Sequence, residues 1–306
     1  MQEQKDNRTL SVCIPTFNRS EILDSNLKYY LPLLKQNEVS LLVSDNCSTD
    51  NTIDILKEHS QNNELLKYYK QDKNIEDRNF PYVLRKNTAD FAWLLSDKHR
   101  INKDGISRIK ELINQDDYDL IVTNHTMRVK NIPTKVYTDC EQMLKDIGWH
   151  MTDICTLIFS KSLIATTPFE RFSNTNFMHV GGIFEALATK DSFKVLWLNE
   201  NLFERLAFKN IPGGWNSKVY RVWVESWSNA ILSLPPSHYS IQSKIECLQK
   251  HNRNTKIFKL RRMFKYKRLN FYRQNTYKRL KSILPLATGK PKWLHLLILL
   301  YPTLRK

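Results

Sequence analysis

Glycine is scarce in this sequence, with 7 among 306 residues, and none of them lies in the loop directly after the first apolar run. That run, residues 10–16 (LSVCIPT), continues into Phe17-Asn18-Arg19 and not into a G-x-G-x-x-G turn. Because such a turn lets the backbone approach the pyrophosphate of a dinucleotide, its absence argues against a dinucleotide-binding Rossmann domain.

Cysteine is also sparse and scattered. The 5 cysteines are odd in number and include no C-x-x-C pair, which argues against both a disulfide framework and a zinc site. The first ten residues, MQEQKDNRTL, lack the apolar core of a secretory signal. We therefore expect a cytoplasmic protein with free thiols.

Acidic residues are absent from residues 250–306, a segment that carries 17 lysines and arginines. Residues 1–249 are nearly neutral, with 30 basic against 31 acidic side chains. This asymmetry predicts a tail attracted to a polyanion, either an anionic lipid surface or a nucleic acid. The tail ends in the apolar run WLHLLILLYP, which is about half the roughly 20 residues of a membrane-spanning helix and predicts a segment lying in the interface.

Strand-like and helix-like segments alternate over the first 125 residues. Such alternation is typical of an α/β protein with a mostly parallel sheet and helices on both faces. Ligands bind beyond the carboxyl ends of parallel strands, so the loops after Thr16, Ser44 and Ser96 should meet on one side. The predicted strands are 10–16, 39–44, 65–70, 91–96 and 120–123, and the predicted helices are 21–35, 52–59 and 106–113.

Three motifs stand at the ends of these strands: S-V-C-I-P-T-F-N-R at 11–19, V-S-D-N-C-S-T-D-N-T at 43–52 and F-A-W-L-L-S-D-K-H-R-I at 91–101. Through their order and spacing, residues 10–205 resemble the large family of inverting GT-A glycosyltransferases, particularly its bacterial members that build surface polysaccharides. The resemblance implies a Rossmann-like GT-A fold and a nucleotide diphosphate sugar as donor, with UDP as the expected nucleotide.

The resemblance also implies a donor site. In the family, the loop after the first strand packs around the nucleotide, and an acidic residue at the end of the second strand reads the base. Asp45 occupies that position and can accept a hydrogen bond from the imide N–H of uracil, whereas Asp50 is interpreted as the cap of the helix near Thr52. Asn74, Arg78 and Asn79 lie where the family has a donor-lining stretch with Asn and Gly residues, but the glycine is missing here, and a solvated loop is the alternative. The implied residues are Pro15, Thr16, Asn18, Arg19, Asp45, Asn46, Ser48, Asn74, Arg78, Asn79, Ser96, Asp97 and Lys98.

The third motif departs from the family, which has two or three aspartates where this chain has Asp97, Lys98 and His99. In one interpretation Asp97 and His99 hold Mn²⁺ or Mg²⁺, which neutralises charge on the leaving nucleotide diphosphate. In a second interpretation Lys98 and Arg100 supply that positive charge without a metal. In a third, the substitutions have inactivated the enzyme.

An inverting transferase also needs a general base for the acceptor hydroxyl. His179 stands where the family places an acidic residue before a helix, and the pKa of imidazole suits the role. Asp153 and Glu185 are the alternative bases. Candidates for stacking on a sugar ring are Trp149, Trp215, Trp223 and Trp227, each of which can instead be a core residue.

The sequence thus predicts a GT-A domain over residues 1–245 and a basic, largely helical C-terminal extension over 246–306. The nucleotide-sugar half covers about 1–125 and the acceptor half 126–245. The predicted reaction transfers a sugar to a lipid-linked or growing polysaccharide acceptor of the cell surface, at the inner face of the cytoplasmic membrane, which residues 250–306 contact. The alternative is a degenerate scaffold that binds nucleic acid through the tail. Because the transferase motifs accompany the tail, nucleic acid is not the partner we expect.

Overall fold

The apolar runs form the strands that they predict, in a computed structural model that describes residues 7–204 and 216–301. Eight strands make the main sheet and two more make a short separate pair. The strands of the main sheet are β1 (Leu10–Thr16), β2 (Ser40–Asp45), β3 (Leu66–Lys70), β4 (Phe91–Leu94), β6 (Leu120–Thr123), β7 (Lys135–Tyr137), β8 (Leu157–Ser160) and β9 (Val195–Leu198), and the pair is β5 (Arg100–Ile101) with β10 (Phe203–Glu204).

The main sheet has the strand order β3-β2-β1-β4-β8-β6-β9-β7. Only β7 and β8 run against the other six strands, so the predicted mostly parallel sheet is confirmed. The chain leaves β1 toward β2 and β3 and then returns to β4 on the other side of β1. This reversal of strand order creates a crevice at the carboxyl ends of β1 and β4.

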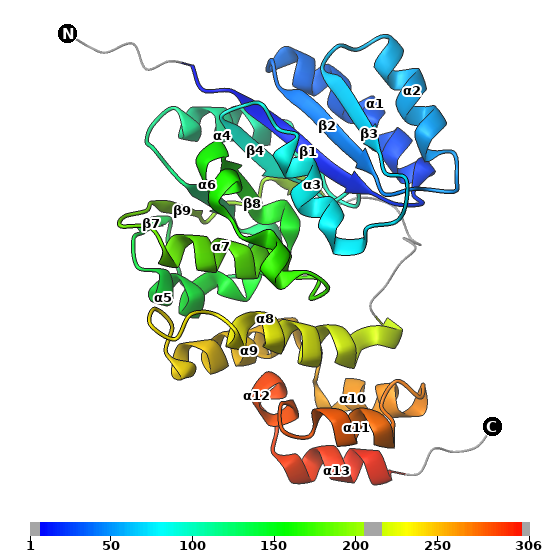
Figure 1. Ribbon diagram of the computed structural model, residues 1–306, viewed down its shortest axis with the longest axis vertical. Helices are drawn as coiled ribbons and strands as arrows, with labels where there is room; N and C mark the ends of the chain where they lie inside the picture. The colour runs from blue at the N-terminus through cyan, green and yellow to red at the C-terminus, as the bar shows by residue number, and fades with distance from the viewer. Residues whose placement is uncertain (1–6, 205–215, 302–306) are drawn as a thin grey trace.

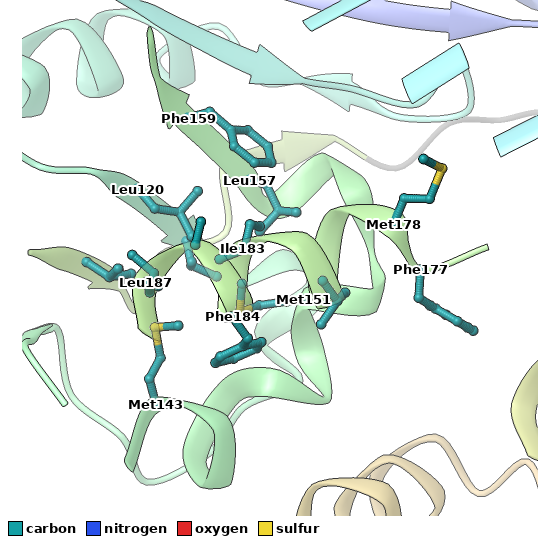
Figure 2. Close-up of a cluster of buried hydrophobic side chains, with 14 of the residues drawn as sticks. Leu120, Met143, Met151, Leu157, Phe159, Phe177, Met178, Ile183, Phe184 and Leu187 are labelled. Atoms are coloured by element: carbon teal, nitrogen blue, oxygen red, sulfur yellow. The ribbon is translucent and has the colours of Figure 1, made fainter. Parts of the chain in front are cut away.

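Helices cover both faces of the sheet, as predicted (Figure 1). Alternate residues of β1 supply the two cores: Val12 and Ile14 pack with α1 and α4, while Cys13 packs with α3 and α7. Figure 2 shows the part of the second core in which side chains of β8 and α7 gather. The helices around the sheet are α1 (Ser20–Gln36), α2 (Thr52–Gln61), α3 (Asn79–Arg85), α4 (Gly105–Ile113), α5 (Cys140–Met143), α6 (Lys161–Thr166) and α7 (Met178–Ala188).

The last part of the chain is a folded helical region with its own core. Val219 and Tyr220 belong to this third core together with tail residues such as Phe258 and Tyr272, and the Tyr220 and Tyr272 rings stack at 4.5 Å. The predicted boundary after residue 245 falls inside α9, which packs on α8 and α12. The helices of this region are α8 (Trp227–Leu232), α9 (Ile241–Thr255), α10 (Leu260–Arg268), α11 (Gln274–Leu280), α12 (Leu284–Thr288) and α13 (Lys292–Leu300).

The Asp50 carboxylate ties together the beginnings of α1 and α2. One oxygen accepts the Ser20 N–H at 2.9 Å, and the other accepts the Thr52 N–H at 3.1 Å and the Thr52 hydroxyl at 2.6 Å. Partial burial alone would raise the pKa of Asp50, but these hydrogen bonds outweigh it and lower the pKa. The predicted capping role near Thr52 is therefore confirmed, and it extends to α1.

We predict that Asp50→Ala lowers the free energy of unfolding by about 1 kcal/mol at neutral pH, since two helix starts lose their acceptor. A carboxylate whose pKa is lowered on folding stabilises above its unfolded pKa, near 3.8, and this contribution is lost as the pH falls through the lowered value. Denaturant unfolding between neutral and acidic pH measures both effects, with Asp72→Ala as the exposed control. A difference of the same size at every pH would contradict the ionic origin of the cap.

Candidate active site

A cavity of about 610 Å³ opens at the carboxyl ends of β1, β2 and β4. The loops after these three strands meet there, as predicted from the sequence. The opposite wall comes from residues 152–154, 174–179 and 218–223. The cavity therefore lies between the predicted nucleotide-sugar half and the acceptor half. The part of the second wall formed by residues 218–223 leads into the helical region.

Asp97 joins the loops after β1 and β4 at the floor of the cavity. Its side chain is 1% exposed and forms an ion pair with Arg19. The other carboxylate oxygen accepts the Thr16 hydroxyl at 2.9 Å, and Asn26 donates to the Asp97 backbone oxygen at 2.7 Å. Both oxygens of Asp97 are thus engaged by the protein itself.

Lys98 and Arg100, the two cations proposed from the sequence as charge neutralisers, point to different places. Lys98 lines the cavity, and burial together with the nearby Arg19 lowers the pKa of Lys98. Arg100 turns toward α1, where it donates to the Asn26 side chain at 3.0 Å and lies 4.4 Å from the centre of the Tyr29 ring. Only Lys98 of this pair can act on a molecule in the cavity.

Asparagines line the side of the cavity formed by the loop after β2. Asn46 donates to Asn74 at 3.0 Å and accepts the Ile75 N–H at 2.8 Å, and Asn79 donates to the Ser44 carbonyl at 2.9 Å. These bonds hold the predicted donor stretch against β2, so it is an ordered wall.

Besides Glu185, four predicted site residues lie outside the lining of the cavity. Asp45 is fully buried beside Asn46 and accepts the Ser48 N–H at 3.1 Å, so base recognition by Asp45 stays a prediction. Asn18 and Ser48 bind each other, since the Asn18 N–H donates to the Ser48 hydroxyl at 2.8 Å. Arg78 is exposed outside the cavity.

Glu185, an alternative catalytic base, requires a correction. It lies on α7 outside the cavity lining and forms an ion pair with Arg171. Because this partner holds the carboxylate away from the cavity, Glu185 is not positioned to reach an acceptor there.

His179 does line the cavity, from the first turn of α7. The side chain is nearly fully buried, between Phe80 and Phe177, whose ring centres lie 5.9 and 6.4 Å from that of His179. Burial lowers the pKa of His179 to about 4, so the imidazole is neutral at neutral pH.

Asp153 lines the cavity opposite Asp97 and stands in a network that the sequence did not predict. His125 Nδ1 lies 2.8 Å from one carboxylate oxygen and Arg128 lies 3.6 Å from the same oxygen. Burial alone would raise the pKa of Asp153, but the His125 contact and the neighbouring positive charges outweigh it and lower the pKa. Asp153 is therefore ionised at neutral pH.

The comparisons with known proteins agree with this geometry. The family model for glycosyl transferase family 2 matches residues 11–178, which is more than half of the chain. This chain belongs to glycosyltransferase family 2. The predicted family is thereby confirmed.

Three similar proteins illustrate how this family 2 chain relates to known ones, one by sequence and two by structure. The abequosyltransferase RfbV of Salmonella typhimurium is 31% identical over 101 residues, which are 32% of this chain and 30% of that protein. Residues 1–349 of Staphylococcus aureus TarS superpose with a TM-score of 0.56 at 18% identity, over 90% of this chain and 83% of theirs. The Pyrobaculum calidifontis mannosyltransferase PcManGT, solved with GDP-Man and Mn²⁺, superposes with a TM-score of 0.52 at 13% sequence identity. The match covers 95% of this chain and 79% of the mannosyltransferase. The GT-A fold is confirmed.

The two predicted metal ligands of this family 2 chain have different neighbours, so their joint binding of Mn²⁺ or Mg²⁺ stays a prediction. Asp97 is already ion-paired with Arg19, whereas His99 belongs to a different group of possible ligands. That group consists of His99, His125, Asp153 and Cys155, whose ligand atoms all lie within 4.8 Å of one another. Sequence reasoning missed His125 and Cys155 because no short spacing links them. The position of His125 just after β6 was the available signal.

Aromatic and cationic residues from the acceptor side complete the lining. Trp223 lines the cavity and stacks on His251 at 4.3 Å, whereas Trp149 and Trp227 are core residues and Trp215 lies outside the described residues. Lys218 and Arg221 also face the cavity. No motif marked these cations, because they lie far along the chain from the three motifs.

We predict that Arg19→Met lowers the free energy of unfolding by about 3 kcal/mol, because it leaves the buried Asp97 carboxylate without its partner charge. The double variant Arg19→Met/Asp97→Asn should recover part of the loss, since the unpaired charge is then gone. Denaturant unfolding of both single variants and the double variant measures the coupling. Additive effects would show that the pair does not hold the two loops together.

Proposed function

We propose that this family 2 protein transfers a sugar from a nucleotide diphosphate sugar, with UDP as the nucleotide, to an acceptor hydroxyl with inversion. The observation that carries the proposal is a cavity at the β1/β4 crevice in which cations from three parts of the chain converge: Arg19, Lys98, and the pair Lys218 and Arg221. A diphosphate placed among them meets positive charge from several sides. Such fixed charge stabilises the nucleotide diphosphate as it leaves.

The cations do not all contribute equally. Arg19 pairs with Asp97, and Lys98 lies close enough to interact with the charges of both. Lys218 and Arg221 bring further positive charge from the helical region to the cavity. Lys218 and Arg221 line the cavity and are exposed to solvent. Their charges stay hydrated until a diphosphate binds, so the empty site does not have to bury them. This proposal follows the second interpretation of the third motif, in which cationic side chains neutralise the leaving diphosphate. Arg221 takes the role that the sequence suggested for Arg100.

His179 is the general base in this proposal. It faces the cavity from the acceptor side, and its neutral imidazole can accept the proton of the acceptor hydroxyl as the oxygen attacks the anomeric carbon. Asp153 remains the alternative base. Attack on the face opposite the leaving diphosphate, in a single displacement, inverts the anomeric configuration.

Similar proteins support the donor class and suggest the acceptor class. TarS has been solved in complex with UDP-GlcNAc, and the archaeal mannosyltransferase with GDP-Man. The abequosyltransferase matches part of the chain. We propose a lipid-linked or growing polysaccharide of the cell surface as acceptor.

We also propose that α13 contacts an anionic membrane surface, which would place the enzyme on the inner face of the cytoplasmic membrane. Trp293, Leu296, Leu297 and Leu300 follow helical spacing and are 42–73% exposed, so they form one apolar stripe. The surrounding tail carries cations and no acidic residue, which complements anionic lipid headgroups. Within the described residues, no helix combines the length and apolar character needed to cross a bilayer.

Nucleic-acid binding by the tail is less compatible with this arrangement. Phe258, Tyr266 and Tyr272, which the sequence interleaves with cations, are packed in the third core. Buried rings cannot stack on bases, so packing in the third core accounts for these three aromatic residues without nucleic-acid binding.

We predict that UDP binds the purified protein and that Lys98→Met weakens this binding about tenfold, because a charged contact to the diphosphate is lost. Isothermal titration calorimetry measures the affinities, with Lys103→Met, an exposed lysine outside the cavity, as control. A panel of nucleotide sugars then tests transfer, and NMR of the product reports the anomeric configuration. Retained configuration, or equal UDP binding by Lys98→Met, would contradict the proposal.

A separate prediction concerns the membrane surface. Trp293→Ser/Leu297→Ser should lower binding to phosphatidylglycerol vesicles about tenfold or more, because two apolar side chains no longer leave water. Vesicle flotation measures the bound fraction, and Ile241→Ser removes an equally exposed aliphatic side chain outside the stripe. Equal flotation of both variants would show that the stripe is not the contact.

A further inference from the structure

We propose that His99, His125, Asp153 and Cys155 form a zinc site in the wall of the cavity. The four side chains offer two imidazole nitrogens, a carboxylate oxygen and a thiol sulfur, all within 4.8 Å of one another. This set differs from the predicted pair of Asp97 and His99, and it does not depend on the proposed transferase activity.

The sheet order brings the four residues together. Strands β4 and β6 run in the same direction, and β8 runs antiparallel between them. His99 follows β4, His125 follows β6, and both Asp153 and Cys155 precede the start of β8. All four residues therefore lie at one edge of the sheet, although up to 56 positions separate them in the sequence.

The separations of the ligand atoms suit a small tetrahedral ion. Asp153 oxygens lie 2.8 Å from His125 Nδ1 and 3.1 Å from Cys155 Sγ, and Sγ lies 3.6 Å from Nδ1. The two Asp153 contacts use different carboxylate oxygens. Zinc bonds of about 2.0–2.3 Å place neighbouring ligand atoms about 3.3–3.7 Å apart, so these three side chains are close to the spacing of a zinc site, and the 4.8 Å span of the whole group must shorten on binding. His99 completes the set: its ring lies 4.7 Å from that of His125, and its buried Nδ1 has no hydrogen-bond partner among the described residues.

The donor types select the metal. Mg²⁺ and Mn²⁺ prefer oxygen ligands, whereas imidazole and thiolate together favour Zn²⁺. Binding displaces the thiol proton of Cys155 to solvent, so the ion, one carboxylate and one thiolate sum to zero charge. Arg128, which lies 3.6 Å from Asp153, then stays cationic beside the cavity. His99 and Asp153 also line the cavity, which gives the ion a path of entry.

Cobalt is the spectroscopic probe for this site. The purified protein, stripped with a chelator and titrated with Co²⁺, should show tetrahedral d–d bands and a thiolate-to-cobalt charge-transfer band, and one equivalent of Zn²⁺ should abolish both. Cys155→Ser should remove the charge-transfer band and weaken Zn²⁺ binding about 100-fold. The matched controls are Cys140→Ser and the exposed His238→Gln, which lie outside the group and should leave the titration unchanged.

A second ligand variant guards against misfolding. His99→Gln changes a half-buried ligand and should weaken Zn²⁺ binding while thermal unfolding of the chelated protein stays as in the wild type. Absence of Co²⁺ binding by the wild type, a spectrum without thiolate character, or unchanged Zn²⁺ affinity in Cys155→Ser and His99→Gln would each overturn the proposal. A failure here leaves the UDP titration unaffected, so the two proposals can fail separately.

Discussion

The ion pair between Arg19 and Asp97 is the contact on which the site depends. It joins the loops after β1 and β4 at the crevice where the strand order reverses, and the Thr16 hydroxyl adds a second bond across the same gap. Asp97 is 1% exposed, so its charge is compensated inside the protein. Lys98, Lys218 and Arg221 also line this cavity, and the proposed function assigns these cations to an anionic donor.

The helical region is part of the site as well as an appendage. Val219, Tyr220 and Val224 belong to its core, and the neighbouring Lys218 and Arg221 face the cavity. The stacking of Tyr220 on Tyr272 links these cations to the tail helices. In the proposed arrangement, one folded helical region presents an apolar stripe to a membrane and positive charge to a donor.

Much of the fold could be predicted because local periodicity and sheet order decide it. Alternation in β1 assigns Val12 and Cys13 to opposite cores, and the three motifs fall at strand ends that a parallel sheet brings together. What escaped prediction depends on contacts distant in sequence. Four features leave no periodic trace: the partner of Asp97, the pairing of Glu185 with Arg171, the meeting of His125 with Cys155, and the burial of Phe258, Tyr266 and Tyr272. They follow from tertiary packing, which a pattern of residue types does not encode.

The most direct test of the central claim is a crystal structure of the protein with UDP. We expect a diphosphate between Lys98 and Arg221, above an intact ion pair of Arg19 with Asp97, and a uracil ring on the side of Asp45 and Asn46. UDP bound elsewhere on the molecule, or a diphosphate that displaces Arg19 from Asp97, would contradict it.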